Sequence, residues 1–544
     1  EQQPCPNLVI NEYQETYTAK PRAGHRFVAW EGCGSSTDNT CSFNVPANIV
    51  RGFWSKTADP LIAKFEPQSS GSVSVSGRIT FDLVPQTASN SGASLNYNNI
   101  SQQPVRGATV EAIASTGSAI LTSTITNASG DYSLTLASNT SFRLRVKAEL
   151  KASSPATWDV SVVDNTNSNA VYSILSTTQS SGSANSTLNL NAASGWGGSS
   201  YTSTRAAAPF TILDNIYASM QKVAAAQAGL TFPQLTVNWS VNNVPSSGST
   251  NTGQITTSHY TNGNLFILGA ANNDTDEYDD HIIIHEWGHY FEDKLSRSDS
   301  VGGNHTGAER LDMRVAFGEG FGNALSGIIT DDPFYRDTSG SGQGSGFNFS
   351  VDNNSNTNEG WFNESSVQAI LYDLYDSGNE PGIDTVSLGF GPLLSVLLNE
   401  QKTTSAFTSI FSFMSAIKTN NAANDAAINT LLAAENIVGV GMDSFGSTET
   451  NNGGTDNVLP VYTELNVGVT GVNVCITTTH GSSNKLSNVR FLKFNIASAG
   501  NYTITVQQTS SPSSTDPDLL FVRPNGTIGF SEAVMESTES ATFN

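Results

Sequence analysis

The sequence predicts a multidomain protein in which an α+β domain is flanked by all-β modules. The chain has 544 residues, enough for three or four domains of ordinary size. Apolar and polar residues alternate, as they do in β-strands, towards both ends of the chain, whereas helical spacing dominates between about residues 201 and 446. Helices gathered after strands indicate an α+β architecture for this central part.

The composition excludes several classes of protein. Hydrophobic residues make up 37% of the chain and charged residues 13%, and the net charge is −23. So few charges do not suit a disordered or coiled-coil chain, and the acidic balance opposes nucleic-acid binding. No run of 18 apolar residues is present, so the sequence predicts no transmembrane segment.

Residues 1–68 are predicted to form a small β module. The segment "YTAKPRAGHRFVAWEGCGSSTDNTCSFNVP" resembles the small β repeats of bacterial surface proteins, which implies a spacer or adhesive module. Cys33 and Cys41 flank a loop short enough to close, so we expect a disulfide between them and an oxidising compartment. For Cys5 and Cys475, a mutual pairing and a free thiol are both open.

Residues 69–192 are predicted to form a β-sandwich. Strand-like alternation occurs at residues 73–79 and 108–112, and "TNASGDYSL" places a glycine at a turn before a further strand. The pattern resembles the carboxypeptidase regulatory-like domain, a transthyretin-like β-sandwich found beside secreted peptidases. A Gly/Ser-rich linker is expected over residues 180–200.

The α+β domain is predicted over residues 201–446. Ile212, Ile216, Met220 and Val223 lie on one face of a helix. Strands are expected at residues 235–239 and 265–268, and further helices at residues 277–295, 316–329, 366–375, 391–401 and 406–417.

Residues 455–544 return to strand alternation, at residues 489–496, 502–506 and 519–522. Their order resembles the bacterial pre-peptidase C-terminal domain, with the pattern "F-x-I…A-G-x-Y-x-I-x-V…D-P-D-L". Because such domains normally finish with another strand pair, we expect this β-sandwich to be incomplete.

The strongest chemical signal is the segment "IIIHEWGHYF". His285 and His289 are four residues apart, so a helix places both imidazoles on one face. Zn²⁺ accepts two such nitrogens and needs a third protein ligand, which leaves a fourth position for water. Glu286 follows the first histidine, where its carboxylate can take a proton from that water. The sequence therefore predicts a hydrolytic zinc site.

Two segments, "HEWGHYFED" and "AFGEGFGNALSG", resemble the gluzincin zinc metallopeptidases and, within them, the fungalysin-like group. The resemblance implies a zincin-like metallopeptidase domain whose third zinc ligand is a glutamate on a following helix. Glu309 matches the thermolysin interval, and Glu319 lies ten residues later. Four residues past Glu319 is Asn323, whose amide oxygen can orient a zinc histidine, whereas Met313 follows Glu309 at the same spacing. We therefore expect Glu319 to be the ligand.

The resemblance also points to residues around the metal. The fungalysin-like pattern has Asp where this chain has Asn323, so the histidine that it orients is expected to be less basic and the metal less tightly held. His305, Tyr372 and Tyr375 are candidates for the donor to the oxyanion. The segment "EGWFNESSVQAILYDLYD" resembles the helix behind the cleft in that group and favours Tyr372. The strand at residues 265–268 is expected to pair with an extended substrate.

The segment at residues 272–280 is rich in carboxylate and amide oxygens. It can hold Ca²⁺, although it lacks the glycine and the terminal glutamate of an EF-hand. Acidic residues also stabilise a helix N-terminus through the helix dipole, and we prefer that interpretation. His281, one turn before His285, is expected to be a solvated helix residue.

Two functions follow from these predictions. The first is a secreted or cell-surface zinc endopeptidase that hydrolyses a protein or peptide substrate with a metal-activated water. The alternative is a surface adhesin or structural protein with a non-catalytic peptidase-like domain, because three of the four modules resemble β spacers and Asn323 departs from the family pattern. In both cases the β modules allow association with a cell surface or matrix. Since the chain begins with Glu1, we expect a mature product whose signal peptide was removed.

Overall fold

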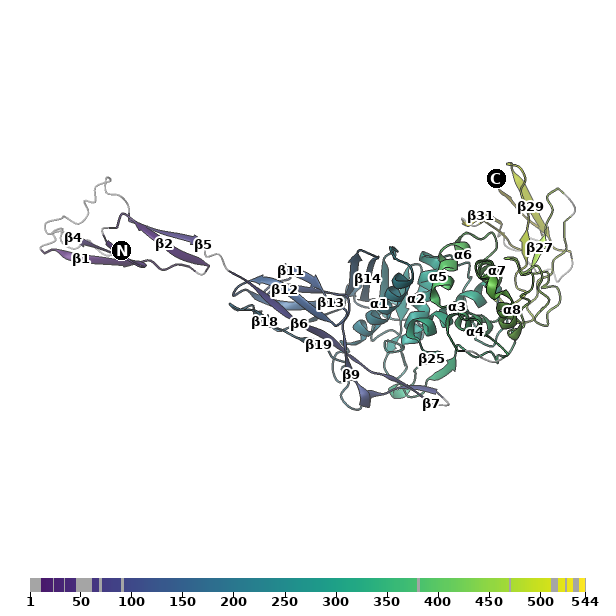
Figure 1. Ribbon diagram of the computed structural model, residues 1–544, viewed down its shortest axis with the longest axis horizontal. Coiled ribbons are helices and arrows are strands. Elements are labelled where there is room, and N and C mark those ends of the chain that lie inside the picture. The colour runs from purple at the N-terminus through teal and green to yellow at the C-terminus, as the bar shows by residue number, and fades with distance from the viewer. Residues whose placement is uncertain are drawn as a thin grey trace.

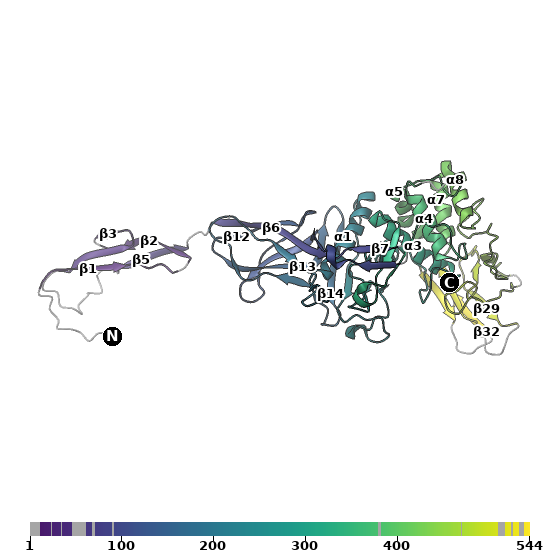
Figure 2. The ribbon, with the colours of Figure 1, turned by 90° about the horizontal axis from the view of Figure 1, so that it is seen from below.

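The computed structural model describes residues 11–22, 24–33, 35–45, 61–67, 71–89, 92–378, 382–468, 471–509, 517–523, 526–531 and 538–543. The molecule is elongated, with the N-terminal strands at one end and the helices and C-terminal strands at the other (Figures 1 and 2). Among the described residues, no helix combines the length and the apolar character needed to cross a bilayer.

The N-terminal part consists of two small antiparallel sheets. One has the strand order β1-β4-β3, and the other pairs β2 with β5. The bounds are β1 (Tyr13–Thr18), β2 (His25–Glu31), β3 (Ser35–Thr37), β4 (Thr40–Val45) and β5 (Ile62–Pro67). The predicted disulfide between Cys33 and Cys41 is confirmed. Cys475 is a free, exposed thiol, and Cys5 lies outside the described residues.

Two larger sheets follow. The five-stranded sheet is built around β6 (Ser72–Leu83), which pairs with β9 (Ser101–Pro104), β12 (Asp131–Ala137), β18 (Ser186–Thr187) and β19 (Leu190–Ala192). The ten-stranded sheet has the main order β11-β10-β13-β14-β20-β22-β21. Its strands are β10 (Ala108–Ala114), β11 (Ile120–Ile125), β13 (Ser141–Ser153), β14 (Thr157–Asp164), β15 (Ala170–Val171), β16 (Ser173–Leu175), β17 (Gln179–Ser180), β20 (Leu235–Trp239), β21 (His259–Thr261) and β22 (Asn264–Ile267).

The ten-stranded sheet crosses the boundary expected near residues 192–201. The long strand β13 pairs with β10 along its first half and with β14 along its second half. Strand β14 then pairs in parallel with β20, with Val160 opposite Leu235. A parallel pair requires a long crossover, and α1 lies within this connection. The strands expected in a separate β-sandwich therefore continue into the sheet of the α+β domain.

Eight α-helices are described, mostly in the central part of the chain. Their bounds are α1 (Ala208–Ala226), α2 (Asp280–Lys294), α3 (Met313–Thr330), α4 (Glu364–Tyr375), α5 (Phe390–Leu398), α6 (Glu400–Thr403), α7 (Ile410–Asn420) and α8 (Asp425–Ala434). Helix α2 begins at Asp280, three residues later than expected, because the backbone of Asp279 is non-helical (φ −97°, ψ 85°). The carboxylate of Asp279 accepts hydrogen bonds from the backbone N–H and the hydroxyl of Thr338. Helix α7 begins at Ile410 because Ser409 and Ser412 form a capping box before it.

Short strand pairs complete the described structure. They are β7 (Gln86–Ser89) with β8 (Gly92–Leu95), β23 (Gly269–Ala270) with β24 (Asp274–Thr275), β25 (Phe334–Asp337) with β26 (Phe347–Ser350), β27 (Tyr462–Glu464) with β28 (Phe491–Lys493), β29 (Tyr502–Gln507) with β32 (Thr538–Phe543), and β30 (Leu519–Arg523) with β31 (Gly526–Ser531). The strand expected at residues 489–496 is thus only three residues long, and it pairs in parallel with β27.

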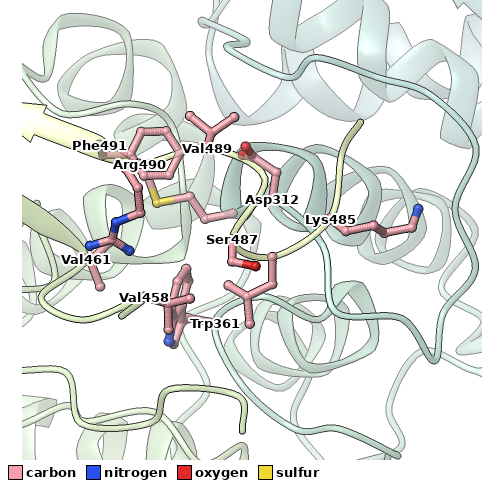
Figure 3. Close-up of a pocket in the computed structure, with 11 residues that line it drawn as sticks. Asp312, Trp361, Val458, Val461, Lys485, Ser487, Val489, Arg490 and Phe491 are labelled. Atoms are coloured by element: carbon pink, nitrogen blue, oxygen red, sulfur yellow. The ribbon is translucent and has the colours of Figure 1, made fainter. Parts of the chain in front are cut away.

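The C-terminal segment packs onto the beginning of α3. A narrow pocket marks this junction, and Asp312, Trp361, Lys485 and Phe491 are among its lining residues (Figure 3). Arg314, which forms a bidentate ion pair with Asp312, stacks over the ring of Phe491. This junction is the N-terminal cap of the helix that carries Glu319, so the C-terminal part helps to position α3.

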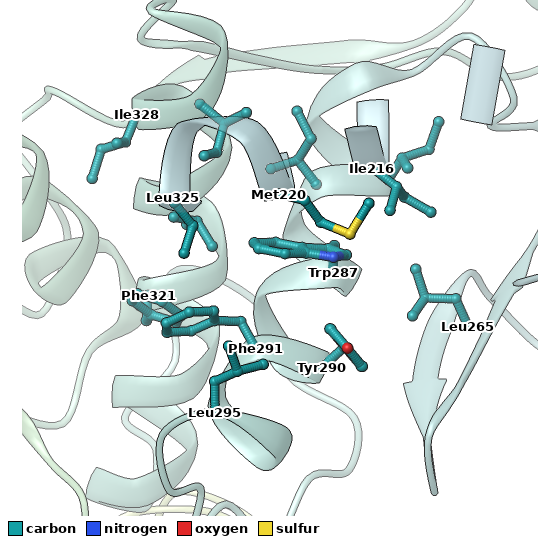
Figure 4. Close-up of a cluster of buried hydrophobic side chains, with 14 of the residues drawn as sticks. Ile216, Met220, Leu265, Trp287, Tyr290, Phe291, Leu295, Phe321, Leu325 and Ile328 are labelled. Atoms are coloured by element: carbon teal, nitrogen blue, oxygen red, sulfur yellow. The ribbon is translucent and has the colours of Figure 1, made fainter. Parts of the chain in front are cut away.

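The buried core is continuous from the sheets into the helices. One cluster of buried apolar residues extends from Val75 in β6 to Phe491 in β28. In its centre, the ring of Trp287 on α2 lies between Met220 of α1 and Leu325 of α3, with Leu265 of β22 nearby (Figure 4). Because α2 is buried against three elements at once, its rotation about its own axis is determined by packing.

Candidate metal centre

Helix α3 can approach α2 and α4 closely because it carries glycines at alternate positions. A Cβ added to Gly322 would lie 2.8 Å from Nδ1 of His285 on α2, and one added to Gly320 would lie 2.6 Å from Cβ of Val367 on α4. Opposite Gly322, a Cβ added to Gly288 would lie 3.3 Å from the Cα of Gly322. The run "GEGFG" therefore allows α3 to lie against both neighbours, and side chains larger than hydrogen are excluded at the contact.

This packing brings His285, His289 and Glu319 together. Nε2 of His285 lies 3.1 Å from Nε2 of His289. Oε2 of Glu319 lies 3.3 Å from the first of these nitrogens and 3.4 Å from the second. The three atoms form a nearly equilateral triangle. Neighbouring turns of α2 contribute the two nitrogens, and α3 contributes the oxygen.

The tautomer of His285 follows from a chain of hydrogen bonds behind it. The amide nitrogen of Asn323 donates to Oε1 of Gln368 at 2.9 Å, so the amide oxygen of Asn323 faces His285. Nδ1 of His285 lies 2.8 Å from that oxygen and must donate its proton there. Nε2 of His285 therefore presents a lone pair to the triangle, as a metal ligand requires.

Glu292 stands behind His289 in a comparable position. Its Oε2 lies 3.9 Å from Nδ1 of His289, and its side chain is 1% exposed. Neither oxygen of this carboxylate has a hydrogen-bond partner among the described residues. Sequence reasoning missed Glu292 as an orienting group, although a carboxylate three residues after a candidate histidine ligand lies on the same helix face and was a usable signal.

Electrostatics keep Glu319 ionised. Burial by itself raises the pKa of a carboxyl group, but the adjacent His289, His285 and His305 lower the pKa of Glu319 well below its usual range. Glu286 is also buried, and its charge is among those that raise the pKa of His289. Burial, and then the charges of carboxylates that include Glu286, raise the pKa of Tyr335, whose ring is 6.1 Å from the ring of His285.

His305 joins the cluster from a distant loop. Its Nε2 lies 3.3 Å from Oε2 of Glu319 and 3.4 Å from Oε2 of Glu364, the first residue of α4. Burial lowers the pKa of His305, whereas these two glutamates raise it, to about 9. His305 is therefore a cationic donor at the edge of the cluster at neutral pH.

Tyr372 and Tyr375 lie elsewhere. The ring of Tyr372 packs against Gly327, which is eight residues past Glu319 and so about 12 Å along α3. The hydroxyl of Tyr375 donates to Asp331 at the far end of the same helix. The expectation that Tyr372 donates to the oxyanion is therefore at odds with its position, because α4 runs away from the cluster after Glu364.

Two other residues considered at the sequence level also lie outside the triangle. The carboxylate of Glu309 accepts a hydrogen bond from the backbone N–H of Thr306 and lies 3.4 Å from Nζ of Lys485. His281 is buried and not solvated, since only 2% of it is exposed. Burial lowers the pKa of His281 to about 4, and its Nε2 lies 3.2 Å from the carbonyl oxygen of Asp332, away from the triangle.

The segment at residues 265–268, which was expected to pair with a substrate, includes most of β22, and that strand already has neighbours on both sides. Strand β22 is hydrogen-bonded on one side to β20 and on the other to β21, so its backbone groups are already used. Strand β21 is at the end of the main sheet order among the described strands, and it is antiparallel to β22. A strand edge accepts an extended peptide only where its own groups are unpaired.

The donor set fits a zinc ion. Two imidazole nitrogens and one carboxylate oxygen are the ligands of many catalytic zinc sites, and tetrahedral bonds of about 2.0–2.1 Å place ligand atoms about 3.3–3.4 Å apart. The observed separations of 3.1, 3.3 and 3.4 Å match that spacing. Among the described residues, this triad is one of two groups whose side chains converge as metal ligands do.

Two adjacent helices thus bring an H-E-x-x-H pair and a glutamate to one point, an arrangement suited to binding a metal ion. Residues 222–433 match the family model of the mycolysin C-terminal domain. This match supports a relationship to fungalysin/mycolysin-type metallopeptidases, and the matched segment includes α2, α3 and α4. No match to a curated protein was found.

Proposed function

We propose that this chain is a secreted or cell-surface zinc endopeptidase, with His285, His289 and Glu319 as the metal ligands. The observation that carries the proposal is the triangle of lone-pair atoms, with separations of 3.1–3.4 Å. Two imidazole nitrogens and one carboxylate oxygen at this spacing are a donor set that Zn²⁺ takes in catalytic sites. Asn323 accepts a hydrogen bond from Nδ1 of His285, and Glu292 lies 3.9 Å from Nδ1 of His289.

The residues around the triangle have different roles in the proposed hydrolysis. When bound, zinc supplies a Lewis acid that acidifies water and polarises the peptide carbonyl. Glu286 takes the proton of the attacking water and then delivers it to the leaving amine nitrogen. His305, in place of Tyr372, donates to the developing oxyanion, because it is the cationic group that reaches the cluster. Strand β21 offers its free edge to the substrate backbone.

The experiment measures zinc and activity in the same variants. Wild-type protein should hold about one zinc per chain and digest casein, and Glu286→Gln should keep the zinc and lose digestion. Glu319→Ala should lose tight zinc binding, whereas Glu309→Ala should retain it, because Glu309 lies 3.4 Å from Lys485 and not at the triangle. Loss of zinc from Glu309→Ala, but not from Glu319→Ala, would reverse the ligand assignment.

A non-catalytic surface protein is the second candidate, and Asn323 is the observation that favours it. A neutral amide makes His285 a weaker donor than a carboxylate would. Wild type and Glu286→Gln that are equally inactive, with zinc bound in both, would support this candidate. Asn323→Asp should keep or strengthen zinc affinity in a chelator competition, since the charged carboxylate makes the histidine more basic.

A further inference from the structure

Three carboxylates converge at a second point, outside the zinc triangle. Asp274, Asp276 and Asp337 each offer an oxygen, and these atoms all lie within 4.8 Å of one another. Asp274 begins β24, Asp276 follows that strand, and Asp337 ends β25. Asp276 and Asp337 are far apart in the chain, so two separate segments meet here. Both lie beside the start of α2.

In the part of the chain that the structure describes, no lysine or arginine charge acts appreciably on these three carboxylates. Asp276 is 3% exposed, and its Oδ1 has no hydrogen-bond partner. Its other oxygen accepts only the hydroxyl of Ser258. Oδ1 of Asp274 is likewise buried without a partner. The charges that act on Asp276 come from carboxylates, namely those of Asp274, Asp337 and Asp279.

Neighbouring acids in the same segment are satisfied by other means. Glu277 is fully buried, and its carboxylate forms an ion pair of 2.7 Å with Arg205. Asp279 accepts hydrogen bonds from Thr338 and from the side-chain amide of Gln86. The nearby cation and the nearby neutral donors are thus committed to Glu277 and Asp279. Asp276 is buried at a comparable depth, but it accepts only the hydroxyl of Ser258, and its Oδ1 is left without a donor among the described residues.

The chemistry of the three ligands selects the ion. Only carboxylate oxygens converge, and hard cations such as Ca²⁺ prefer them, whereas Zn²⁺ favours nitrogen and sulfur. Ca²⁺ takes six to eight oxygens at about 2.3–2.6 Å, so three carboxylate oxygens that lie within 4.8 Å of one another can share one ion. Asp274 and Asp337 are only partly buried, which leaves room for water to complete the coordination of the ion.

We propose that Asp274, Asp276 and Asp337 bind one Ca²⁺, which ties the segment entering α2 to the end of β25. The ion supplies a positive charge between the three carboxylates and reinforces two segments that are also joined by the bridge between Asp274 and Ser339 and by the hydrogen bonds of Thr338 to Asp279. It thereby fixes the N-terminal end of the helix that carries His285 and His289. The proposal goes beyond the peptidase function and does not depend on it.

The test is calorimetric titration of CaCl₂ into the full-length, zinc-loaded chain. Wild type should bind about one Ca²⁺, and its melting temperature should rise by several degrees in 1 mM Ca²⁺, since a ligand of the folded state stabilises it. Asp337→Asn and Asp274→Asn should each weaken Ca²⁺ binding at least tenfold. Asp456→Asn, which changes an exposed aspartate far from the cluster in sequence, should bind Ca²⁺ like wild type.

Three outcomes would overturn the proposal. They are no Ca²⁺ binding by wild type, unchanged binding by both cluster variants, and equal affinity for Mg²⁺, which demands stricter octahedral geometry. The variants are placed at the partly exposed Asp337 and Asp274, and not at buried Asp276, so that the fold is retained. Zinc content and far-UV circular dichroism check this, and neither requires peptidase activity.

Discussion

His285 and His289 are held by groups from three helices. The ring of His285 lies between Asn323 and the bare backbone of Gly322 on α3, and Gln368 on α4 fixes the amide of Asn323. His289 is backed by Glu292 on its own helix. The position of each imidazole thus depends on neighbouring residues that are not themselves candidate metal ligands.

Gly322→Ala should lower zinc affinity at least tenfold, because the new Cβ would lie 2.8 Å from Nδ1 of His285 and push the ring out of the triangle. The measurement is chelator competition. Gly391→Ala is the matched control on a helix, since a Cβ there meets nothing within 4 Å. Equal zinc affinity in both variants would mean that the α2–α3 contact is looser than the structure shows.

Glu292→Gln should lower zinc affinity about tenfold, because a neutral amide supports the histidine less strongly than a carboxylate. Glu464→Gln, on an exposed strand residue, provides the control. If Glu292→Gln binds zinc as tightly as wild type, Glu292 only fills space beside Gly318, whose added Cβ would lie 3.3 Å from its Oε2.

At the scale of the element, α2 carries a half-buried acid, Asp280, in its first turn. Burial raises the pKa of Asp280 from 3.8 to about 6, although Asn215 donates a hydrogen bond to its carboxylate. The native state therefore holds this proton more tightly than the unfolded chain. Its contribution to stability is full below the unfolded pKa and is lost as the pH rises through the folded pKa.

Asp280→Asn should therefore flatten the dependence of stability on pH. Relative to the variant, metal-free wild type should lose at most about 3 kcal/mol between pH 4 and pH 6, because a shift of about two pK units is worth that much. Urea unfolding at several pH values, in the presence of a chelator, measures the difference. Parallel curves for the two proteins would show that Asp280 titrates normally.

At the scale of the whole molecule, the sandwich and the helical domain share one sheet and one core. Strand β13 is hydrogen-bonded to β10 and to β14, and β14 is hydrogen-bonded to β20. The buried cluster continues through both parts. Cutting the chain in the expected linker at residues 180–200 would leave β20 without its neighbour and expose apolar side chains on both fragments.

A fragment of residues 201–446 should therefore be insoluble or lack a cooperative thermal transition, whereas residues 71–509, which keep the shared core as far as Phe491, should unfold in one step. Expression of both fragments, followed by circular dichroism melting curves, measures this. A cooperative transition in the shorter fragment would contradict the shared core and favour independent domains.

The sequence by itself was sufficient to predict relations within one element. The helical period places His285, Glu286 and His289 together on α2, and it places Asn323 one turn past Glu319 on α3. The helices near these residues were also predictable, to within about three residues at their ends. Such relations depend only on backbone geometry, which repeats every 3.6 residues whatever the rest of the chain does.

Relations between elements were decided only by the tertiary structure. His305 reaches Glu319 and Tyr372 does not, because loop paths determine where α4 and the segment before α3 lie. Asp337 meets Asp276 for the same reason. Strand alternation indicated strands in this part of the chain but did not indicate that they join the ten-stranded sheet. Alternation shows which face of a strand is buried and carries no information about the neighbouring strand. Long-range packing, which depends on the shapes of many side chains at once, supplied that choice.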